Sequence, residues 1–195
     1  MDVYFIRHGE SEANVSHIHS GWSAVNLTEN GRRQAVSAGR LLKSLHFDRV
    51  ICSDLPRTVQ TAALALPNYQ PEYTAQIREI NTGDCTSKSR QTCLQEYGPD
   101  YLSCLYARNY RNYHGENESD QYARVAAFMQ TLEKDEHSQT VAVVTHDGAL
   151  HAMFCYVLGL PVDKHRLCVQ NASISHLSFQ DGSWTIHQWG MTETF

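Results

Sequence analysis

Two short, continuous apolar runs, each followed closely by a histidine, constrain the fold of this chain more than any other feature. Residues 3–6 (VYFI) lead into Arg7 and His8, and residues 141–144 (VAVV) lead into His146. A run of four apolar residues is too short for a helix, and its lack of alternation indicates a strand that is covered on both faces, as in a parallel sheet. The sequence therefore predicts buried parallel strands that end in polar, titratable side chains.

Segments with helical patterns separate the predicted strands. A further strand is predicted at 48–53. Four segments have apolar residues at helical intervals or boundary residues that are typical of helices. They are residues 28–45, with Thr28 as the N-cap, residues 56–66, which open with Pro56, residues 117–134, and residues 148–160, which end at Gly159 and Pro161. Strands that alternate with helices are typical of an α/β fold.

The C-terminal part of the chain predicts an antiparallel edge for this sheet. Residues 172–179 and 184–190 flank the turn sequence QDGS and have the pattern of a hairpin. We therefore expect a three-layer α/β sandwich with a mostly parallel central sheet, an antiparallel edge and helices on both faces. A chain of 195 residues suits one domain, residues 1–195. Residues 80–116, its least regular part, are expected to form a lid-like excursion over one edge of the sheet.

The composition is that of a globular protein and excludes several classes of function. No apolar stretch approaches the ~20 residues that span a bilayer, and Arg7 and His8 interrupt the N-terminal apolar run, unlike a secretory signal. We therefore expect a cytoplasmic monomer or homodimer without a membrane partner. The net charge of −5 and the lack of a Lys/Arg cluster argue against a nucleic-acid partner. The six cysteines lack C-x-x-C spacing and are expected to be free, mostly buried thiols.

Four basic or titratable side chains follow the ends of three predicted strands. They are Arg7 and His8 after the run 3–6, Arg57 after the strand 48–53, and His146 after the run 141–144. In open α/β sheets, ligands bind outside the carboxyl ends of the strands, so these side chains are expected to converge. Two guanidiniums offer paired donors to phosphate oxygens, and an imidazole can act as a nucleophile. The pattern favours a site for a tetrahedral dianion.

Motifs along almost the whole chain strengthen this interpretation. They are RHGESEAN (7–14), SGWSAVNLTENGRRQA (20–35), SDLPRTVQTA (53–62), IREI (77–80), GENES (115–119) and VVTHDGAL (143–150). With these motifs the chain resembles the histidine phosphatase, or phosphoglycerate-mutase-like, superfamily. The resemblance implies a phosphomonoesterase of the histidine acid phosphatase type, which hydrolyses a small phosphorylated metabolite through a phosphohistidine.

The resemblance also implies a role for each catalytic residue. It makes His8 the nucleophile that becomes phosphorylated, and Arg7, Arg57 and His146 the pocket that holds the phosphoryl group. Glu79 is implied as the proton donor to the leaving oxygen. For Glu79 to carry a proton near neutral pH, burial or the charge of the adjacent phosphate has to raise its pKa.

Three nearby carboxylates leave the identity of the proton donor open. They are Glu72, Asp84 and Glu96. No cofactor or metal is expected, since guanidiniums and imidazoles neutralise the phosphate as Mg²⁺ does elsewhere. His17 and His19, the next candidates for metal ligands, lack a third partner at a regular spacing and are expected at the surface.

Four further positions are implied to contact the substrate. Asn14, Ser20 and Gly21 match family positions that touch the phosphate or the group attached to it. Asp147 follows the second histidine where many members have glycine, and this change places a carboxylate next to the phosphate pocket unless its side chain points away. Four tyrosines are expected on a packed helical face: Tyr101, Tyr106, Tyr110 and Tyr113. Four basic residues are expected to be solvated, with contact to a second anionic group of the substrate as the alternative: Lys88, Arg90, Arg108 and Arg111.

Two other functions compete with hydrolysis. A cofactor-dependent phosphoglycerate mutase returns the phosphoryl group to its intermediate, and members of that branch have arginine and tyrosine soon after the acid. This chain has Ile80 and Thr82 at those places, and Gly148 where mutases have asparagine. It also has the sequence DCTSK at 84–88 where phosphatase members commonly have an aromatic-Glu-Gly pattern. The third possibility is an inactive phosphate-binding module, which the retention of both histidines and both arginines disfavours.

Overall fold

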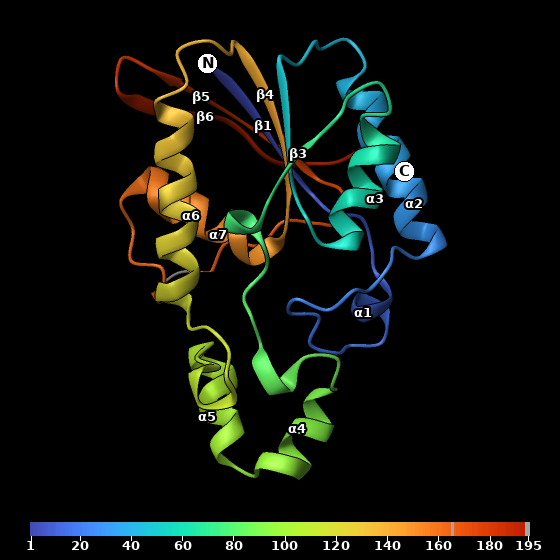
Figure 1. Cartoon of the computed structure of the whole chain (residues 1–195), viewed down its shortest axis with the longest axis vertical. Coiled ribbons are helices and arrows are strands. Elements are labelled where there is room, and N and C mark those ends of the chain that lie inside the picture. Colours follow the sequence, from blue (N-terminus) through green and yellow to red (C-terminus); the bar gives the residue numbers. More distant parts are fainter. Residues whose placement is uncertain (165, 194–195) are drawn as a thin grey trace.

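A six-stranded sheet forms the centre of the protein, with helices on both of its faces (Figure 1). The computed structural model describes residues 1–164 and 166–193. The strands are β1 (Asp2–Arg7), β2 (Arg49–Ser53), β3 (Glu72–Thr74), β4 (Thr140–Thr145), β5 (Ile174–Gln180) and β6 (Ser183–Met191). Their order is β3-β2-β4-β1-β5-β6; the first four are parallel to one another, β5 pairs antiparallel with β1, and β6 pairs antiparallel with β5. The predicted fold class is confirmed.

Two pairs of helices cover the two faces of the sheet. The helices are α1 (Glu12–Val15), α2 (Glu29–Leu42), α3 (Pro56–Ala65), α4 (Arg90–Tyr97), α5 (Asp100–Ala107), α6 (Glu118–Glu133) and α7 (Asp147–Leu158). Val3 and Phe5 of β1 pack with α6 and α7, whereas Ile6 packs with α2 and α3. Alternate residues of a strand point to opposite faces, so an uninterrupted apolar run fills both layers of the core.

The predicted helix boundaries rest on identifiable end groups. The hydroxyl of Thr28 accepts a hydrogen bond from the backbone N–H of Gly31 at 2.9 Å and caps α2. Gly159 ends α7 with a φ of +64°, a conformation that glycine adopts without steric cost. The short helix α1 and the edge strand β3 were not predicted. Neither is long enough to show a period in the sequence.

Residues 80–116 lie beyond the carboxyl ends of the parallel strands, at the bottom of Figure 1. The prediction of irregular structure was wrong for part of this segment, which contains α4 and α5. These two helices have eight residues each and surround a small cluster of buried side chains: Ile80, Cys85, Cys93, Tyr101, Cys104 and Tyr110. Because thiols and tyrosines replace the usual aliphatic residues, the apolar pattern of a helix is weak here.

Two predictions from composition can be compared with the fold. All six cysteines are free thiols and five of them are buried, as expected, with Cys168 exposed. Over residues 1–164 and 166–193, no helix is both long and apolar enough to span a bilayer.

Candidate active site

The register of two parallel strands brings the two predicted histidines together. Arg7 of β1 lies opposite Thr145 of β4, so His8 and His146 leave the sheet side by side. The backbone N–H of His8 donates to the carbonyl of Thr145 at 2.9 Å. The two imidazole rings lie 5.2 Å apart, centre to centre, and both residues are buried. Residues 138 positions apart therefore share one pocket because their strands are neighbours.

The hydrogen bonds of His8 fix which ring nitrogen is available for chemistry. Its Nδ1 lies 2.7 Å from the carbonyl oxygen of Gly9. A carbonyl only accepts hydrogen bonds, so Nδ1 carries the proton and Nε2 keeps its lone pair. Burial, together with the nearby charges of Arg57 and Arg7, lowers the pKa of His8 to about 3. The imidazole is therefore neutral and nucleophilic at neutral pH.

Arg57 is fully buried at the start of α3, where Pro56 opens the helix. Its Nη1 donates to the carbonyl of Ser23 at 3.3 Å and its Nη2 to the carbonyl of Gly21 at 3.0 Å. Burial lowers the pKa of Arg57 to about 10, which leaves it charged at neutral pH. This guanidinium has no carboxylate partner among the described residues, so its charge is available to a ligand.

Asp147 balances the charge of Arg7. Its Oδ1 lies 3.4 Å from Nη1 of Arg7 and accepts a hydrogen bond from the N–H of Val169 at 3.2 Å. The same Nη1 donates to the carbonyl of Val169. The carboxylate is therefore next to the pocket but is occupied by protein donors. Its predicted contact with the substrate stays a prediction.

Three buried nitrogens at this place have no hydrogen-bond partner among the described residues. They are Nε of Arg7, Nε of Arg57 and Nδ1 of His146. The other ring nitrogen of His146 lies 2.8 Å from the hydroxyl of Ser53, at the end of β2. Buried polar groups without partners are rare and costly. An oxyanion with several acceptor oxygens is the kind of ligand that would satisfy all three.

Glu79 lies beside this cluster and accepts hydrogen bonds from three elements. Its Oε1 accepts from the N–H of Ile80 at 2.8 Å and from Nε2 of Gln121 at 3.3 Å, and its Oε2 accepts from the N–H of Gly148 at 3.1 Å. Nη2 of Arg108 lies 3.6 Å from Oε1. Burial, the largest single influence, raises the pKa, but Arg108 and these N–H groups outweigh it and lower the pKa of Glu79 to about 2.

Of the two causes expected to raise the pKa of Glu79, burial and the charge of an adjacent phosphate, burial alone does not leave this residue protonated. Burial acts in the expected direction, but the charges of Arg108 and Arg57 and the N–H groups of Ile80 and Gly148 together favour the charged form more strongly. Without a ligand, Glu79 is a carboxylate at neutral pH. A bound phosphate would raise the pKa of Glu79, because repulsion between the two negative charges disfavours the carboxylate form.

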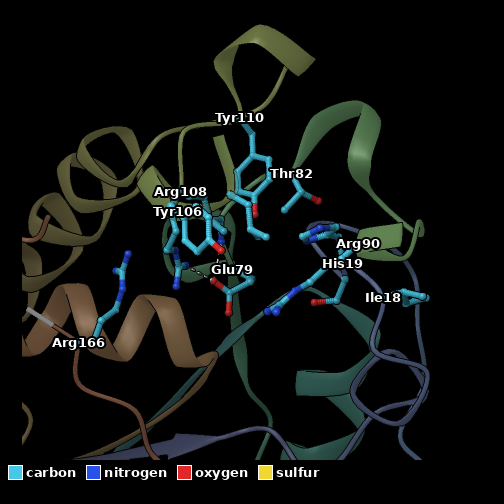
Figure 2. Close-up of a pocket in the computed structure, with 13 residues that line it drawn as sticks. Ile18, His19, Glu79, Thr82, Arg90, Tyr106, Arg108, Tyr110 and Arg166 are labelled. Carbon is cyan, nitrogen blue, oxygen red and sulfur yellow. Dashed lines mark hydrogen bonds and ion pairs between the residues drawn. The ribbon is translucent and has the colours of Figure 1, made fainter. Parts of the chain in front are cut away.

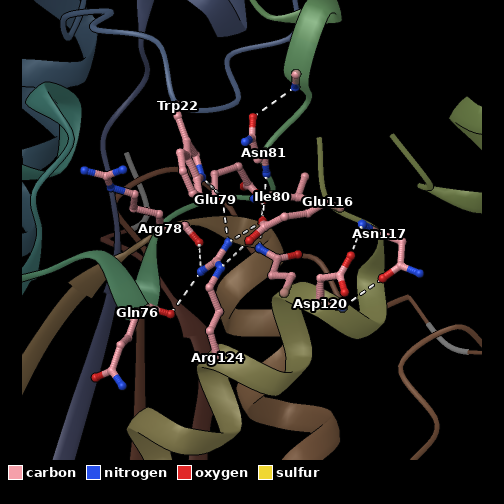
Figure 3. Close-up of polar contacts among 12 residues, drawn as sticks. Trp22, Gln76, Arg78, Glu79, Ile80, Asn81, Glu116, Asn117, Asp120 and Arg124 are labelled. Atoms are coloured by element: carbon pink, nitrogen blue, oxygen red, sulfur yellow. Dashed lines mark hydrogen bonds and ion pairs between the residues drawn. The ribbon is translucent and has the colours of Figure 1, made fainter. Parts of the chain in front are cut away.

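The backbone at Glu79 is held by two residues that sequence reasoning missed (Figure 3). Arg124 of α6 donates through Nη2 to the carbonyl of Glu79 and through Nη1 to that of Arg78, both at 2.8 Å. The indole N–H of Trp22 donates to the same carbonyl of Glu79 at 2.7 Å. Glu116 binds the other side of the Arg124 guanidinium, with Nε to Oε1 at 2.9 Å. The helical pattern around Arg124 gave no signal of this role.

The three competing carboxylates are engaged elsewhere. Glu72 pairs with Arg49 at 2.7 Å, Asp84 contacts His114 at 2.7 Å, and Glu96 pairs with Lys88. None of these three lines the cavity described below. Of the four candidates, Glu79 alone lies beside the histidines in the described structure, and its role as proton donor becomes part of the proposal below.

A cavity of about 430 Å³ opens next to the cluster (Figure 2). Its lining residues are Ile18, His19, Ser20, Gly21, Glu79, Ile80, Thr82, Arg90, Leu105, Tyr106, Arg108, Tyr110 and Arg166. His8, Arg7, Arg57 and His146 do not line this cavity. It meets them at Glu79 and at Gly21, whose carbonyl binds Arg57. The cavity therefore suits the group attached to a phosphate rather than the phosphate itself.

Of the three remaining residues predicted to contact the substrate, two line the cavity and one does not. Ser20 and Gly21 line the cavity, as a contact with the substrate requires. Asn14 does not line it. Its Oδ1 accepts hydrogen bonds at 2.9 Å from both the N–H and the hydroxyl of Ser11, in the capping box of α1. A structural role thus accounts for Asn14, and its contact with the substrate stays a prediction.

Two of the four basic residues expected to be solvated lie at the cavity. Arg90 and Arg108 line it, whereas Lys88 pairs with Glu96 and Arg111 pairs with Asp120 at 2.5 Å. Arg90 is exposed there, and both interpretations, solvation or contact with an anionic group of the substrate, stay predictions for Arg90 and Arg108, which α4 and the turn after α5 place at the cavity.

The cavity also has lining residues that the sequence did not single out correctly. Arg166, from the loop after α7, was missed entirely. His19 lines the cavity, and its Nε2 lies 2.5 Å from the hydroxyl of Tyr101. Burial and then the charge of Arg90 lower the pKa of His19. Of the four tyrosines, Tyr101 and Tyr110 are buried as expected for a packed face, but Tyr106 is 79% exposed at the cavity.

A metal-ligand cluster among the described residues lies elsewhere. Asp2, His176 and His187 have ligand atoms within 4.8 Å of one another. They lie at the opposite end of β1 from His8, and the rings of His176 and His187 are stacked at 4.5 Å. Nε2 of His176 lies 2.7 Å from Oδ1 of Asp2, and Nε2 of His187 lies 2.8 Å from the hydroxyl of Ser178, so a protein group already faces this nitrogen of each ring. Within residues 1–164 and 166–193, no such cluster includes the histidines of the candidate site.

Comparisons with known proteins identify relatives over almost the full length. A family model described as histidine phosphatase superfamily (branch 1) matches residues 3–192. The chain is 29% identical over 188 residues to an adenosylcobalamin/α-ribazole phosphatase of Escherichia coli (strain K12), which covers 95% of this chain and 88% of that protein. It is 31% identical over 195 residues to a protein of Salmonella paratyphi A described as a probable phosphoglycerate mutase, with coverage of 97% and 90%.

Solved structures show the same architecture. The α-ribazole phosphatase from Shigella flexneri superposes with a TM-score of 0.90 at 27% identity, over 98% of this chain and 96% of that chain. A mycobacterial glucosyl-3-phosphoglycerate phosphatase in complex with VO3 superposes with a TM-score of 0.86 at 25% identity, over 98% and 99%. Together with the family match over residues 3–192, these likenesses agree with the motifs read from the sequence. The chain belongs to the histidine phosphatase superfamily, branch 1.

Proposed function

We propose that this protein hydrolyses small phosphate monoesters through a phosphohistidine on His8. The observation that carries the proposal is the set of three unpartnered buried nitrogens, on Arg7, Arg57 and His146, around a neutral imidazole with a free Nε2. A phosphoryl group supplies oxygens for the nitrogens and an electrophilic phosphorus for the imidazole. The cytoplasmic location, the histidine acid phosphatase-type class and the single domain with a lid at 80–116 belong to the same proposal.

In the first step, Nε2 of His8 attacks phosphorus while the bond from phosphorus to the ester oxygen breaks. Arg57 and Arg7 hold the equatorial oxygens of the phosphoryl group, and His146 donates through Nδ1–H while Nε2 accepts from the hydroxyl of Ser53. The leaving oxygen takes a proton from Glu79, which becomes a carboxylate. The dianionic phosphate raises the pKa of Glu79 from its ligand-free value, because both groups are negative.

In the second step, water attacks the phosphohistidine and releases inorganic phosphate. The carboxylate of Glu79 takes a proton from this water, and the bond between Nε2 of His8 and phosphorus breaks. The ionised state of Glu79 in the ligand-free protein suits this base role directly. One residue thereby serves as acid in the first step and as base in the second.

The contacts of Gly148 favour hydrolysis over the mutase reaction. A Cβ atom at this position would lie 2.2 Å from Oε1 of Glu79 and 2.7 Å from Nη2 of Arg108. The asparagine that mutases place here would therefore displace the ends of these two side chains, so that Glu79 could not keep its present position beside Gly148. The names of the relatives do not decide the matter, since they include α-ribazole phosphatases and a protein described as a probable phosphoglycerate mutase.

A substrate assay tests the proposal against both alternatives. We expect phosphate release from p-nitrophenyl phosphate and from small sugar or glycerol phosphates without added 2,3-bisphosphoglycerate or metal. Radiolabelled substrate should leave an acid-labile label on the wild-type protein and none on His8→Ala. Isomerisation of phosphoglycerate that depends on the bisphosphate would favour a mutase. Vanadate binding without turnover of any ester would indicate an inactive binding module.

A further inference from the structure

The ring of the nucleophile is oriented by the backbone carbonyl of a glycine. The carbonyl of Gly9 accepts the proton of Nδ1 of His8 at 2.7 Å, and this bond leaves Nε2 free. Glycine has no side chain and adopts a wide range of backbone conformations. A Cβ atom at Gly9 would lie 2.3 Å from the carbonyl oxygen of Gly31, so a stiffer residue does not fit here. Other groups therefore have to set the direction of this carbonyl.

Two side chains hold the peptide groups on either side of Gly9. The N–H of Gly9 donates to the hydroxyl of Thr61 at 3.1 Å, and the N–H of Glu10 donates to Oε1 of Gln34 at 2.8 Å. The second bond acts directly on the carbonyl of Gly9, because this carbonyl and the N–H of Glu10 belong to one planar peptide group. An acceptor that holds the N–H thus also fixes the direction of the carbonyl.

The hydrogen bonds of Thr61 commit its lone pairs to Gly9. Its hydroxyl lies 2.7 Å from the carbonyl of Arg57, one turn earlier in α3, and has to donate there because a carbonyl only accepts. The oxygen then accepts from the N–H of Gly9. Thr61 is fully buried, and Gln34 is half-buried in α2. The two helices on this face of the sheet thus supply one acceptor each.

Other groups hold the backbone before Gly9. The N–H of His8 donates to the carbonyl of Thr145 at 2.9 Å, and the carbonyl of His8 accepts from the N–H of Ala172 and from Nδ2 of Asn171, both at 3.1 Å. These bonds attach His8 to β4 and to the loop before β5. They act on the peptide group that precedes Gly9, whereas the carbonyl that meets the imidazole lies in the peptide group that follows it.

We infer that Thr61 and Gln34 are positioning residues for the nucleophile, which aim the carbonyl of Gly9 at Nδ1–H of His8 and so keep the lone pair of Nε2 free for phosphorus. This inference rests on the proposed function. The hydrogen bond at one nitrogen of a neutral imidazole decides which of the two nitrogens carries the proton. If the carbonyl turns away, the proton is free to move to Nε2, which then lacks the lone pair that attacks phosphorus.

Imidazole ¹⁵N NMR of the full chain at neutral pH measures the tautomer, and His8→Ala identifies the signals of His8. We expect Nδ1–H in the wild type, an added Nε2–H population in Thr61→Val and in Gln34→Met, and the largest such population in the double variant. In the double variant, kcat/KM for p-nitrophenyl phosphate should fall by roughly 10- to 100-fold, since small displacements of a reacting group have costs of this size. Thr61→Ser keeps the hydroxyl and should keep the wild-type tautomer and kcat/KM.

Two control variants remove matched hydrogen bonds elsewhere. Oε1 of Gln60 accepts from the N–H of Leu27 at 2.9 Å, and the hydroxyl of Ser175 accepts from the N–H of Gly190 at 3.0 Å. Gln60→Met and Ser175→Ala should lower the melting temperature about as much as Gln34→Met and Thr61→Val. They should change neither the tautomer of His8 nor kcat/KM, because neither residue contacts the backbone at Gly9.

Two outcomes would overturn the inference. One is an unchanged tautomer of His8 in the folded single and double variants, and the other is a loss of kcat/KM in Thr61→Ser that equals the loss in Thr61→Val. Melting curves establish which variants are folded, and the single variants answer the question if the double variant is not. Failure of the proposed function looks different, because the wild type would then leave p-nitrophenyl phosphate unhydrolysed while the NMR spectra still report the tautomer.

Discussion

The candidate site has two regions: a floor, formed by Arg7, His8, Arg57 and His146, and a wall, formed by the residues that line the neighbouring cavity. The protein holds these two regions in place in different ways. His8, Arg57 and His146 of the floor are at most 5% exposed, and each follows a strand of the central sheet. On the wall, Tyr106 is 79% exposed and Arg90 has no carboxylate partner among the described residues. The floor is rigid because two layers of core surround its strands, whereas the wall rests on two short helices around a small cluster.

This difference separates two kinds of effect on catalysis. Every ester presents the same phosphoryl group, so changes in the floor should slow all substrates alike. Esters differ in their leaving groups, so changes near the wall should alter the ranking of substrates. Glu79 lies between the two regions. The charge of Arg57 in the floor favours its ionised form, and Nη2 of Arg108 in the wall lies 3.6 Å from its Oε1. Substitutions at each place test whether this division holds.

Replacement of the nucleophile should have the largest effect. We expect His8→Ala to lower kcat by roughly 10⁴-fold for all esters, since His146, the other imidazole at this site, donates through Nδ1–H and has its Nε2 on the hydroxyl of Ser53. Steady-state phosphate release from several esters measures this loss. His137→Ala, which removes an exposed histidine far from the site, should retain full activity. Unequal losses among esters with His8→Ala would contradict the division.

Loss of the buried guanidinium of Arg57 should have the second-largest effect on activity. Arg57→Gln should lower kcat/KM by about 10²- to 10³-fold for all esters, because it removes charge and donors aimed at the phosphoryl group. Arg57→Lys should not restore activity, since an ammonium lacks the planar set of donors that reaches both Gly21 and Ser23. Melting curves check that each variant is folded, because the substitution removes a hydrogen-bond donor from the carbonyls of Gly21 and Ser23. Activity of Arg57→Lys near the wild-type level would show that charge alone suffices.

Removal of the proton donor should give the first effect that depends on the leaving group. We expect Glu79→Gln to lower kcat/KM for alkyl esters by about 10²-fold, and for p-nitrophenyl phosphate far less, because p-nitrophenolate departs without a proton. A plot of log kcat/KM against leaving-group pKa for both proteins measures the difference in slope, since kcat/KM reports the first step and not the hydrolysis of the phosphohistidine. Equal slowing of every ester would count against the acid role.

Much of the floor could be predicted from the sequence because its position depends on strand order and register alone. Arg7 and Thr145 are paired in β1 and β4, so two motifs 138 residues apart necessarily deliver their histidines to one place. The predicted Thr28 cap and the Gly159 stop follow equally local rules. Such features depend on backbone geometry, which short patterns encode.

The wall could not be predicted in the same way because it depends on where side chains point. Arg166 and Arg124 come from a loop and from the face of a long helix, and neither position has a local signal of its partners. The ionised state of Glu79 escaped prediction for a similar reason. Burial was foreseeable, but the donors from Gly148 and Arg108 that reverse its effect are set by packing between distant elements.

Arg124 allows a test of whether the backbone of Glu79 needs its support. Arg124→Gln removes donors to the carbonyls of Glu79 and Arg78, which should cost about 1–3 kcal/mol of stability and lower kcat for alkyl esters by about tenfold. Arg49→Gln is a matched control, because Arg49 pairs with Glu72 and Asp135 away from the site. It should lower the melting temperature without changing kcat. An equal kcat loss in both variants would reduce the role of Arg124 to general stability.

The smallest expected effect is a displacement along the pH axis rather than a loss of rate. Arg108 lies 3.6 Å from Oε1 of Glu79 and helps to lower the pKa of this carboxyl, against the opposing effect of burial. Arg108→Gln removes one of the influences that favour the charged form, so the pKa of Glu79 should rise. The protonated fraction falls as pH rises through this pKa. The alkaline limb of kcat for glycerol 3-phosphate should therefore move to higher pH, by about one unit.

The same pH profile measured with p-nitrophenyl phosphate provides the internal control for Arg108→Gln. Since that ester does not need a proton from Glu79, its alkaline limb should stay in place. A limb that moves equally for both esters would mean that Arg108 acts on the floor of the site, through the phosphate or His8. A limb that moves to lower pH for glycerol 3-phosphate would mean that Arg108 supports the protonated form of Glu79. Either result would break the boundary between floor and wall at the residue where the two regions meet.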